Sequence, residues 1–160
     1  MARRISTWLL ILCTMALVGC DHATKLVASA ALRDRTVDLV PGVLDLQYTE
    51  NHDVAFSLLR PAAIPGRPMV LLVLAAIGTV FVAFLWWRRR DLATTAEHVG
   101  WSLTMAGALG NMVDRVLRGY VVDFIHVRHW PVFNVADALV VAGVVLLAFG
   151  RRKHQDADAV

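Results

Sequence analysis

Residues 69–90 read MVLLVLAAIGTVFVAFLWWRRR, and this stretch decides the class of fold. No charged residue interrupts it from Met69 to Trp87, and a helix that crosses a bilayer needs about 20 apolar residues in succession. The run ends on two tryptophans followed by three arginines, a pattern typical of the cytoplasmic end of a membrane span. We therefore expect a transmembrane helix over residues 69–87.

The composition of the whole chain agrees with a membrane protein. Hydrophobic residues make up 58% of the 160 residues and charged residues only 18%, whereas soluble domains average about 25% charged. The length suits one domain, so we expect a single polytopic membrane domain over residues 1–160. The net charge of +3 does not indicate nucleic acid, because no basic stripe with interleaved aromatic residues is present.

Three other apolar blocks predict membrane spans, over residues 5–25, 97–117 and 134–150. The block at 97–117 is rich in small residues, which suits a helix that packs closely against others. The basic clusters Arg3-Arg4, Arg88 to Arg90 and Arg151 to Lys153 each adjoin an apolar block. With four spans, all three clusters fall on one side, which places both termini in the cytoplasm. The expected fold is therefore an all-α membrane protein with four transmembrane helices.

Two segments are expected on the outer side of the membrane. In the first outer loop, 28–68, apolar and polar residues alternate on both sides of Pro41-Gly42, which predicts a small β-hairpin. The second outer loop, 118–132, mixes apolar residues with charged ones and histidines, which favours an interfacial or re-entrant segment.

Polar residues of three spans fall at one depth. At 1.5 Å per residue, Asn111 and Asp137 each lie about 20 Å from the cytoplasmic end of their span, and Asp21 lies about 24 Å from its own. Asp114 and Asn134 lie one turn farther out. We expect these side chains to meet in the outer third of the membrane. Asp123 reaches that depth only if the second outer loop dips inward.

The chemistry of such a site follows from its carboxylates. A charge inside a span costs roughly 2.5–3.5 kcal/mol, so it indicates function. Two carboxylates held close together share one proton at neutral pH, and the pair can then activate water with one member and protonate the leaving group with the other. This chemistry requires no metal and no serine or cysteine nucleophile. The sequence contains no Gly-x-Ser-x-Gly or His-Glu-x-x-His motif.

The polar residues lie in five strings that together resemble the lipoprotein signal peptidases, also called signal peptidase II. The resemblance runs from about Asp21 to Asp137, and the third and fifth strings are the most specific. The strings are Asp21-His-Ala-Thr-Lys25, Asn51-His-Asp-Val-Ala-Phe-Ser57, Gly107-Ala-Leu-Gly-Asn-Met-Val-Asp-Arg115, Val122-Asp-Phe124 and Phe133-Asn-Val-Ala-Asp137.

The resemblance implies an aspartic endopeptidase of the bacterial cytoplasmic membrane, with its active site near the outer face. It implies cleavage of prolipoproteins just before the lipid-modified cysteine, contact with membrane lipid, and inhibition by globomycin. Asp123 and Asp137 match the catalytic pair. The remaining matches shape the pocket, bind substrate or support stability, namely Asn111, Asp114, Arg115, Asn134, Asp21, Lys25 and Asn51. We expect a monomer without cofactor or metal.

Two positions depart from the pattern of the family. His22 stands where members usually have glutamine, and Asp53 stands where they usually have glycine. Neither touches the proposed catalytic pair. Asp53 adds a charge to a loop expected to cover the substrate, so substrate preference is affected more than the type of reaction.

Several residues also have simpler structural explanations. Asp137 and Asn134 could serve only the start of a helix, and Asp123 could be a solvated loop acid. Asp114 and Arg115 could belong to a purely structural ion-pair network, and Asp21 with Lys25 could form an interfacial salt bridge. Asp123, His126 and His129 could suggest a metal site, although their spacing does not fit one helical face.

The sequence is also compatible with two other kinds of protein. A small transport or proton-relay protein would also carry acids inside the membrane, although it would need them throughout the membrane depth. The segment Leu17-Val-Gly-Cys20 after an apolar run resembles the cleavage site of a lipoprotein precursor. Cleavage there would remove one span and reverse the sidedness of the basic clusters.

Overall fold

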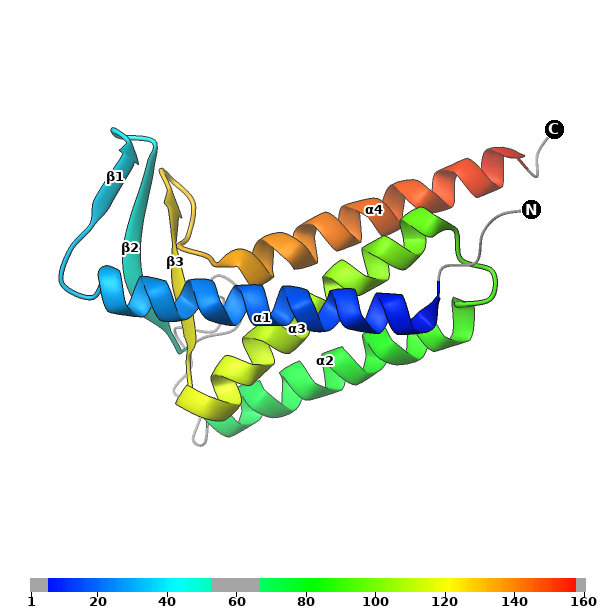
Figure 1. Cartoon of the computed structure of the whole chain (residues 1–160), viewed down its shortest axis with the longest axis horizontal. Coiled ribbons are helices and arrows are strands. Elements are labelled where there is room, and N and C mark those ends of the chain that lie inside the picture. Colours follow the sequence, from blue (N-terminus) through cyan, green and yellow to red (C-terminus); the bar gives the residue numbers. More distant parts are fainter. Residues whose placement is uncertain (1–5, 53–66, 158–160) are drawn as a thin grey trace.

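The computed structural model describes residues 6–52 and 67–157. Within them, four helices and three strands follow one another in the order α1, β1, β2, α2, α3, β3, α4 (Figure 1). The helices are α1 (Thr7–Ala31), α2 (Arg67–Arg89), α3 (Thr95–Arg118) and α4 (Val135–Ala157), and the strands are β1 (Val37–Val40), β2 (Leu44–Asn51) and β3 (Val121–Val127).

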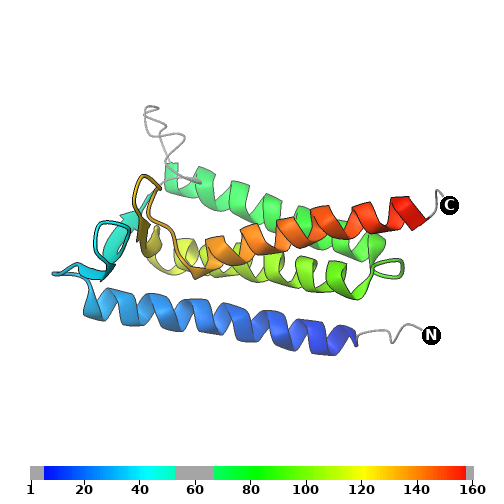
Figure 2. The same ribbon diagram turned by 90° about the horizontal axis from the view of Figure 1, so that it is seen from above.

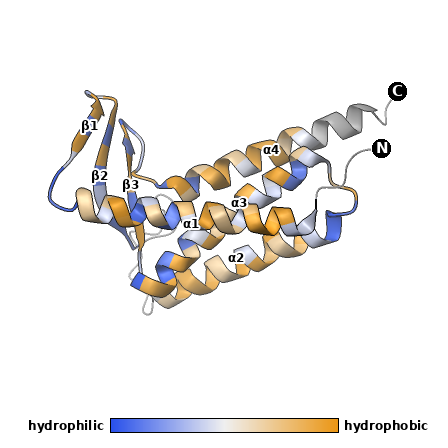
Figure 3. Cartoon of the chain, viewed as in Figure 1, coloured by the Kyte–Doolittle hydropathy of each residue, from blue (hydrophilic) through white to orange (hydrophobic). Residues whose placement is uncertain are grey.

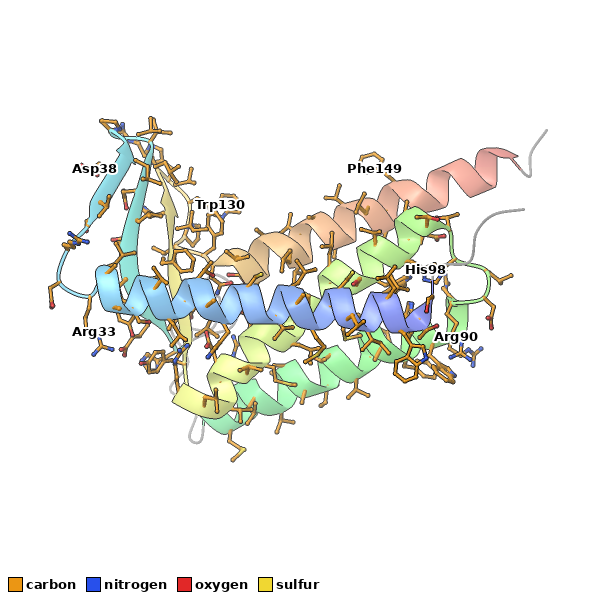
Figure 4. The ribbon with its side chains drawn as sticks, viewed as in Figure 1. Arg33, Asp38, Arg90, His98, Trp130 and Phe149 are labelled. Carbon is orange, nitrogen blue, oxygen red and sulfur yellow. The ribbon has the colours of Figure 1, made fainter. Side chains whose placement is uncertain are left out.

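Helix α3 is the centre of the bundle, because it packs against α1, α2 and α4. The amino end of α1, the α2–α3 connection and the carboxyl end of α4 lie at one end of the bundle, and the sheet lies across the other (Figures 1 and 2). Among the labelled side chains, Arg90 and His98 lie at the first end, and Arg33 and Trp130 lie at the sheet end (Figure 4).

Two of the helices, α1 and α2, are long and apolar enough to cross a membrane, and the apolar part of α4, Val135–Gly150, is shorter. Helix α2 is hydrophobic along nearly its whole length (Figure 3). On α4, Phe149 is exposed and points away from the bundle (Figure 4), as a side chain in contact with lipid would. Each span expected from the sequence lies largely within one helix. The number of helices that cross the bilayer stays a prediction.

Small residues allow α3 and α4 to approach closely, as the sequence predicts. A Cβ atom added to Gly107 would lie 2.2 Å from the carbonyl oxygen of Ala136. A Cβ atom added to Gly143 of α4 would lie 2.3 Å from Oγ1 of Thr104. This contact fixes the start of α4 against the middle of α3.

The predicted hairpin is confirmed by strands β1 and β2. The turn between them places Gly42 at φ +70°, a conformation that glycine adopts without strain, and the Val43 amide donates to the Val40 carbonyl at 2.9 Å. Residues 53–66 of the first outer loop, including Asp53, lie outside the described residues.

The segment 118–132 contains a strand that the sequence analysis does not predict, and its interfacial or re-entrant position stays a prediction. Residues 121–127 form strand β3, which pairs antiparallel with β2 and completes a sheet in the order β1-β2-β3. Pairing satisfies the backbone groups of this segment. Phe124 is buried against Ala28 and Leu32 of α1, so the sheet is fixed to the end of that helix. The strand brings Asp123 to the bundle, where Asn134 donates to it.

Candidate active site

Asp123 lies on β3 and is held by two amide side chains. It is only 2% exposed. Asn51 of β2 donates from Nδ2 to Asp123 Oδ2 at 2.7 Å, and Asn134 donates from Nδ2 to Asp123 Oδ1 at 2.6 Å. The interpretation of Asp123 as a solvated loop acid is therefore wrong.

Asp137 lies in the first turn of α4 and forms a capping arrangement with Asn134. The Asp137 amide donates to Asn134 Oδ1 at 3.1 Å, and the Asn134 amide donates to Asp137 Oδ2 at 3.2 Å. The other carboxylate oxygen, Oδ1, accepts from Asn111 Nδ2 of α3 at 2.8 Å. Both residues thus support the start of the helix and belong to the same polar cluster as Asp123.

A chain of amides connects the two carboxylates. Asn134 Nδ2 donates to Asp123 and also to Asn111 Oδ1, the latter at 3.1 Å, and Asn111 donates in turn to Asp137. Asn134 is fully buried. The two aspartates, called the aspartate pair below, are therefore fixed by neutral donors.

A small cavity opens onto the aspartate pair. Its volume is about 50 Å³, enough for a water molecule, whose share of liquid volume is about 30 Å³. Arg115 contributes to its wall and donates from Nη1 to the Asn111 carbonyl at 3.2 Å. The lining residues are Asn51, Asn111, Arg115, Val121, Asp123, Val132 and Asp137.

Burial raises the pKa of the Asp123 carboxyl to about 6, from an ordinary value of 3.8. The hydrogen bond from Asn51 opposes this shift, the negative charge of Asp137 adds to it, and the hydrogen bond from Asn134 opposes it again. A carboxyl with this pKa can exchange a proton near neutral pH.

A second polar cluster lies between α1 and α3, here called the lysine cluster: Asp21, Lys25, Asp114 and Arg118. Lys25 Nζ lies 2.8 Å from Asp21 Oδ2 and 3.1 Å from Asp114 Oδ2, and Arg118 also pairs with Asp114. Asp21, Lys25 and Asp114 are fully buried. The Asp21–Lys25 pair is therefore a buried ion pair.

The predicted residues thus divide into two groups. The structure brings Asn51, Asn111, Arg115, Asp123 and Asp137 to the cavity, and Asn134 joins this group through its hydrogen bonds to Asp123 and Asn111. It places Asp21, Lys25 and Asp114 in the lysine cluster, next to Asn111. Arg118 is not among the residues expected from the sequence, although its i, i+4 spacing from Asp114 is typical of an ion pair on one helix face.

The histidines proposed as metal ligands have other surroundings. His126 Nδ1 lies 3.0 Å from Asp45 Oδ2 on the neighbouring strand. Within residues 6–52 and 67–157, no group of three histidine, cysteine or acidic side chains could hold a metal ion.

Comparison with known proteins gives one consistent family. The family model described as signal peptidase II matches residues 13–151. A lipoprotein signal peptidase from Caldicellulosiruptor bescii is 34% identical over 142 residues, 89% of this chain and 87% of the relative. One from Pseudoalteromonas translucida is 38% identical over 142 residues, 85% of this chain and 83% of the relative.

Solved structures agree. A bacterial membrane enzyme determined by the in meso method superposes with a TM-score of 0.81 at 26% identity, covering 97% of this chain and 94% of the other. A second such structure gives a TM-score of 0.78, covering 93% and 96% of the two chains. This chain, with its helices, its sheet and its polar clusters, therefore belongs to the signal peptidase II family.

Proposed function

We propose that this protein is a membrane aspartic endopeptidase that removes signal peptides from prolipoproteins by hydrolysing the peptide bond before the diacylglyceryl-modified cysteine. Membership of the signal peptidase II family supports the substrate and the reaction. The observation that carries the catalytic type is the aspartate pair, joined through Asn134 and Asn111 beside a cavity with room for water.

The geometry suits general acid–base hydrolysis. The pair holds one proton, and the proton belongs to both members. The ionised carboxylate takes a proton from water as the water oxygen bonds to the scissile carbonyl carbon. The protonated carboxyl donates to the carbonyl oxygen, which gives a tetrahedral diol. A proton then passes to the amide nitrogen, the C–N bond breaks, and the new amino group leaves on the lipid-modified cysteine.

The neighbouring residues have distinct roles in this proposal. Asn51, Asn111 and Asn134 hold the carboxylates in place as hydrogen-bond donors. Arg115 brings a positive charge to the cavity wall and offsets negative charge that develops on the substrate. Asp21, Lys25 and Asp114 bind the supporting helices together.

We place the protein in the cytoplasmic membrane of a bacterium, as a single domain over residues 1–160 with four spanning helices and both termini in the cytoplasm. The basic clusters of the sequence adjoin the bundle end opposite the sheet, and the aspartate pair lies at the sheet end (Figure 1). This arrangement supports a site near the outer face, where lipid-modified precursors would approach sideways from the bilayer. Globomycin is the expected inhibitor and a monomer the expected state.

The alternative functions have less support. A proton relay needs ionisable groups along the membrane depth, but α2 carries none from Met69 to Trp87. A processed lipoprotein would be cut before Cys20, yet α1 continues through that residue without a break to Ala31.

The test is cleavage of a diacylglyceryl-modified prolipoprotein by the purified protein in detergent. The parent should cut before the modified cysteine, and Asp123→Asn and Asp137→Asn should be inactive although folded. A chelator should leave the parent unaffected. Activity near the parental level in either variant would refute the aspartate assignment, and a folded parent that never cuts would refute the function.

A further inference from the structure

Lys25 is a buried cation without access to substrate. Its exposed fraction is 0%, and its ammonium contacts three oxygens: Asp21 Oδ2 at 2.8 Å, Asn111 Oδ1 at 2.9 Å and Asp114 Oδ2 at 3.1 Å. The contact with Asn111 is a hydrogen bond, and the contacts with the two carboxylates are ion pairs. Each contact leads to a segment that carries one of the catalytic aspartates.

The contact between Lys25 and Asn111 fixes the orientation of the Asn111 amide. A side-chain amide can rotate by 180° and exchange its oxygen with its NH₂ group. An ammonium cannot face an NH₂ group, so Lys25 holds the oxygen of Asn111 toward itself. The NH₂ group of Asn111 must then point to Asp137 Oδ1, to which it donates at 2.8 Å.

The other two contacts fix the backbone beside each aspartate. Asp114 Oδ2, which contacts Lys25, also accepts from the Val122 amide at 3.2 Å, one residue before Asp123. Asp21, whose Oδ2 contacts Lys25, accepts through Oδ1 from the Ala136 amide at 2.9 Å, one residue before Asp137. A single ammonium thus joins the supports of β3 and of α4.

We propose that Lys25 is the positioning residue of the aspartate pair: it orients Asn111 toward Asp137, connects the anchors of β3 and α4, and sets the charge environment of the pair without touching substrate. This role rests on the proposed function, and it goes beyond a contribution of Lys25 to stability alone. Loss of the ammonium should lower kcat and leave KM nearly unchanged.

The pH dependence of the reaction provides a second signature. The charge of Lys25 favours the ionised form of Asp123. Removing it should move both limbs of the pH profile of kcat/KM to higher pH, by about 1 unit. The other charged groups around Lys25 and the pair are Asp21 on α1, Asp114, Arg115 and Arg118 on α3, Asp123 on β3 and Asp137 on α4.

The experiment compares two matched variants. Lys25→Met alone leaves Asp21 without its cation, so the informative variant is Asp21→Asn/Lys25→Met and the control is Asp21→Asn, which retains the ammonium. We expect the double variant to have a kcat at least tenfold below the control, a KM within twofold of it, and both limbs displaced upward. An unmoved profile, or an equal loss in the control, would overturn the proposal.

Two further measurements test the positioning role of Lys25, and the second does so without relying on the proposed peptidase activity. If Lys25 acts through Asn111, the kcat loss of Lys25→Met/Asn111→Ala should fall well short of the product of the two single losses; a full product would overturn the role. Infrared titration of the Asp123 carboxyl, identified by its absence in Asp123→Asn, needs no substrate. Its midpoint should be higher in Asp21→Asn/Lys25→Met than in Asp21→Asn, and equal midpoints would overturn the proposal even if the parent cleaves nothing.

Discussion

The two polar clusters around α3 contain the same kind of acid in opposite settings. In the lysine cluster, Asp21 and Asp114 each contact a cation, and both are fully buried. In the aspartate pair, the carboxylates are held by neutral amides and face a cavity. The carboxylates that pair with Lys25 hold α1 and α3 together. A carboxylate held by amides retains the ability to exchange a proton.

The largest expected effect tests this division directly. Asp137→Asn should lower kcat by about 10³-fold and leave the folded fraction nearly unchanged, because it removes an acid–base group. Asp114→Asn should lower the free energy of unfolding by about 3 kcal/mol, because it breaks a buried ion pair. Cleavage rates per folded protein and thermal unfolding in detergent measure the two effects. The reverse pattern, with activity lost in Asp114→Asn and stability lost in Asp137→Asn, would invalidate the comparison.

The pH dependence of stability sharpens the comparison. The pKa of Asp123 is about 6 when folded and near 3.8 when unfolded, so folding favours its neutral form. This contribution to stability is fully present below about pH 4 and is lost as the pH rises through about 6. Asp123→Asn removes the dependence, so its stability relative to the parent should increase over this range by up to about 3 kcal/mol. Parallel curves for parent and variant would show that Asp123 is not perturbed.

The close contact of α3 with α4 should have an effect of about 2 kcal/mol. In Gly107→Ala the new methyl group meets the Ala136 carbonyl, so the start of α4 must move and stability falls. The matched control is Gly78→Ala on α2, where a Cβ meets nothing within 4 Å and helix propensity improves. The thermal unfolding midpoints of the two variants in detergent measure this effect. Equal midpoints would mean that α3 and α4 can move apart at this contact without loss of stability.

The smallest effect concerns an acid outside both clusters. Asp45 pairs with His126 across the partly exposed face of β2 and β3. Asp45→Asn should lower stability by less than about 1 kcal/mol and leave cleavage unchanged, since exposed pairs contribute little. A large loss of activity in this variant would indicate that the sheet contributes chemistry beyond Asp123.

The shared level of the polar residues along the bundle could be predicted from the sequence, and their separation into two clusters could not. A fixed rise per residue places Asp21, Asn111 and Asp137 at one level whatever their neighbours are. The side of α3 that each residue faces depends on how the helices pack, which is set by contacts such as that of Gly107 with Ala136.

The sheet, too, could be predicted only in part from the sequence. The hairpin of β1 and β2 follows from alternation around a local turn. The paired residues of β2 and β3 lie 70 to 83 positions apart in the sequence, from Asn51 with Val121 to Leu44 with Val127. Buried residues follow one another from Val121 to Phe124 without alternation. Asp123 was therefore expected to depend on an inward dip of the loop and not on a strand.

The reciprocal hydrogen bonds between Asn134 and Asp137 couple the winding of the first turn of α4 to the placement of the Asp137 carboxylate. The same turn is tied to the bundle, because the Ala136 amide donates to Asp21 and Ala136 packs closely against Gly107. The turn cannot open without breaking these buried contacts. Activity and the fold should therefore be lost in one cooperative transition on heating.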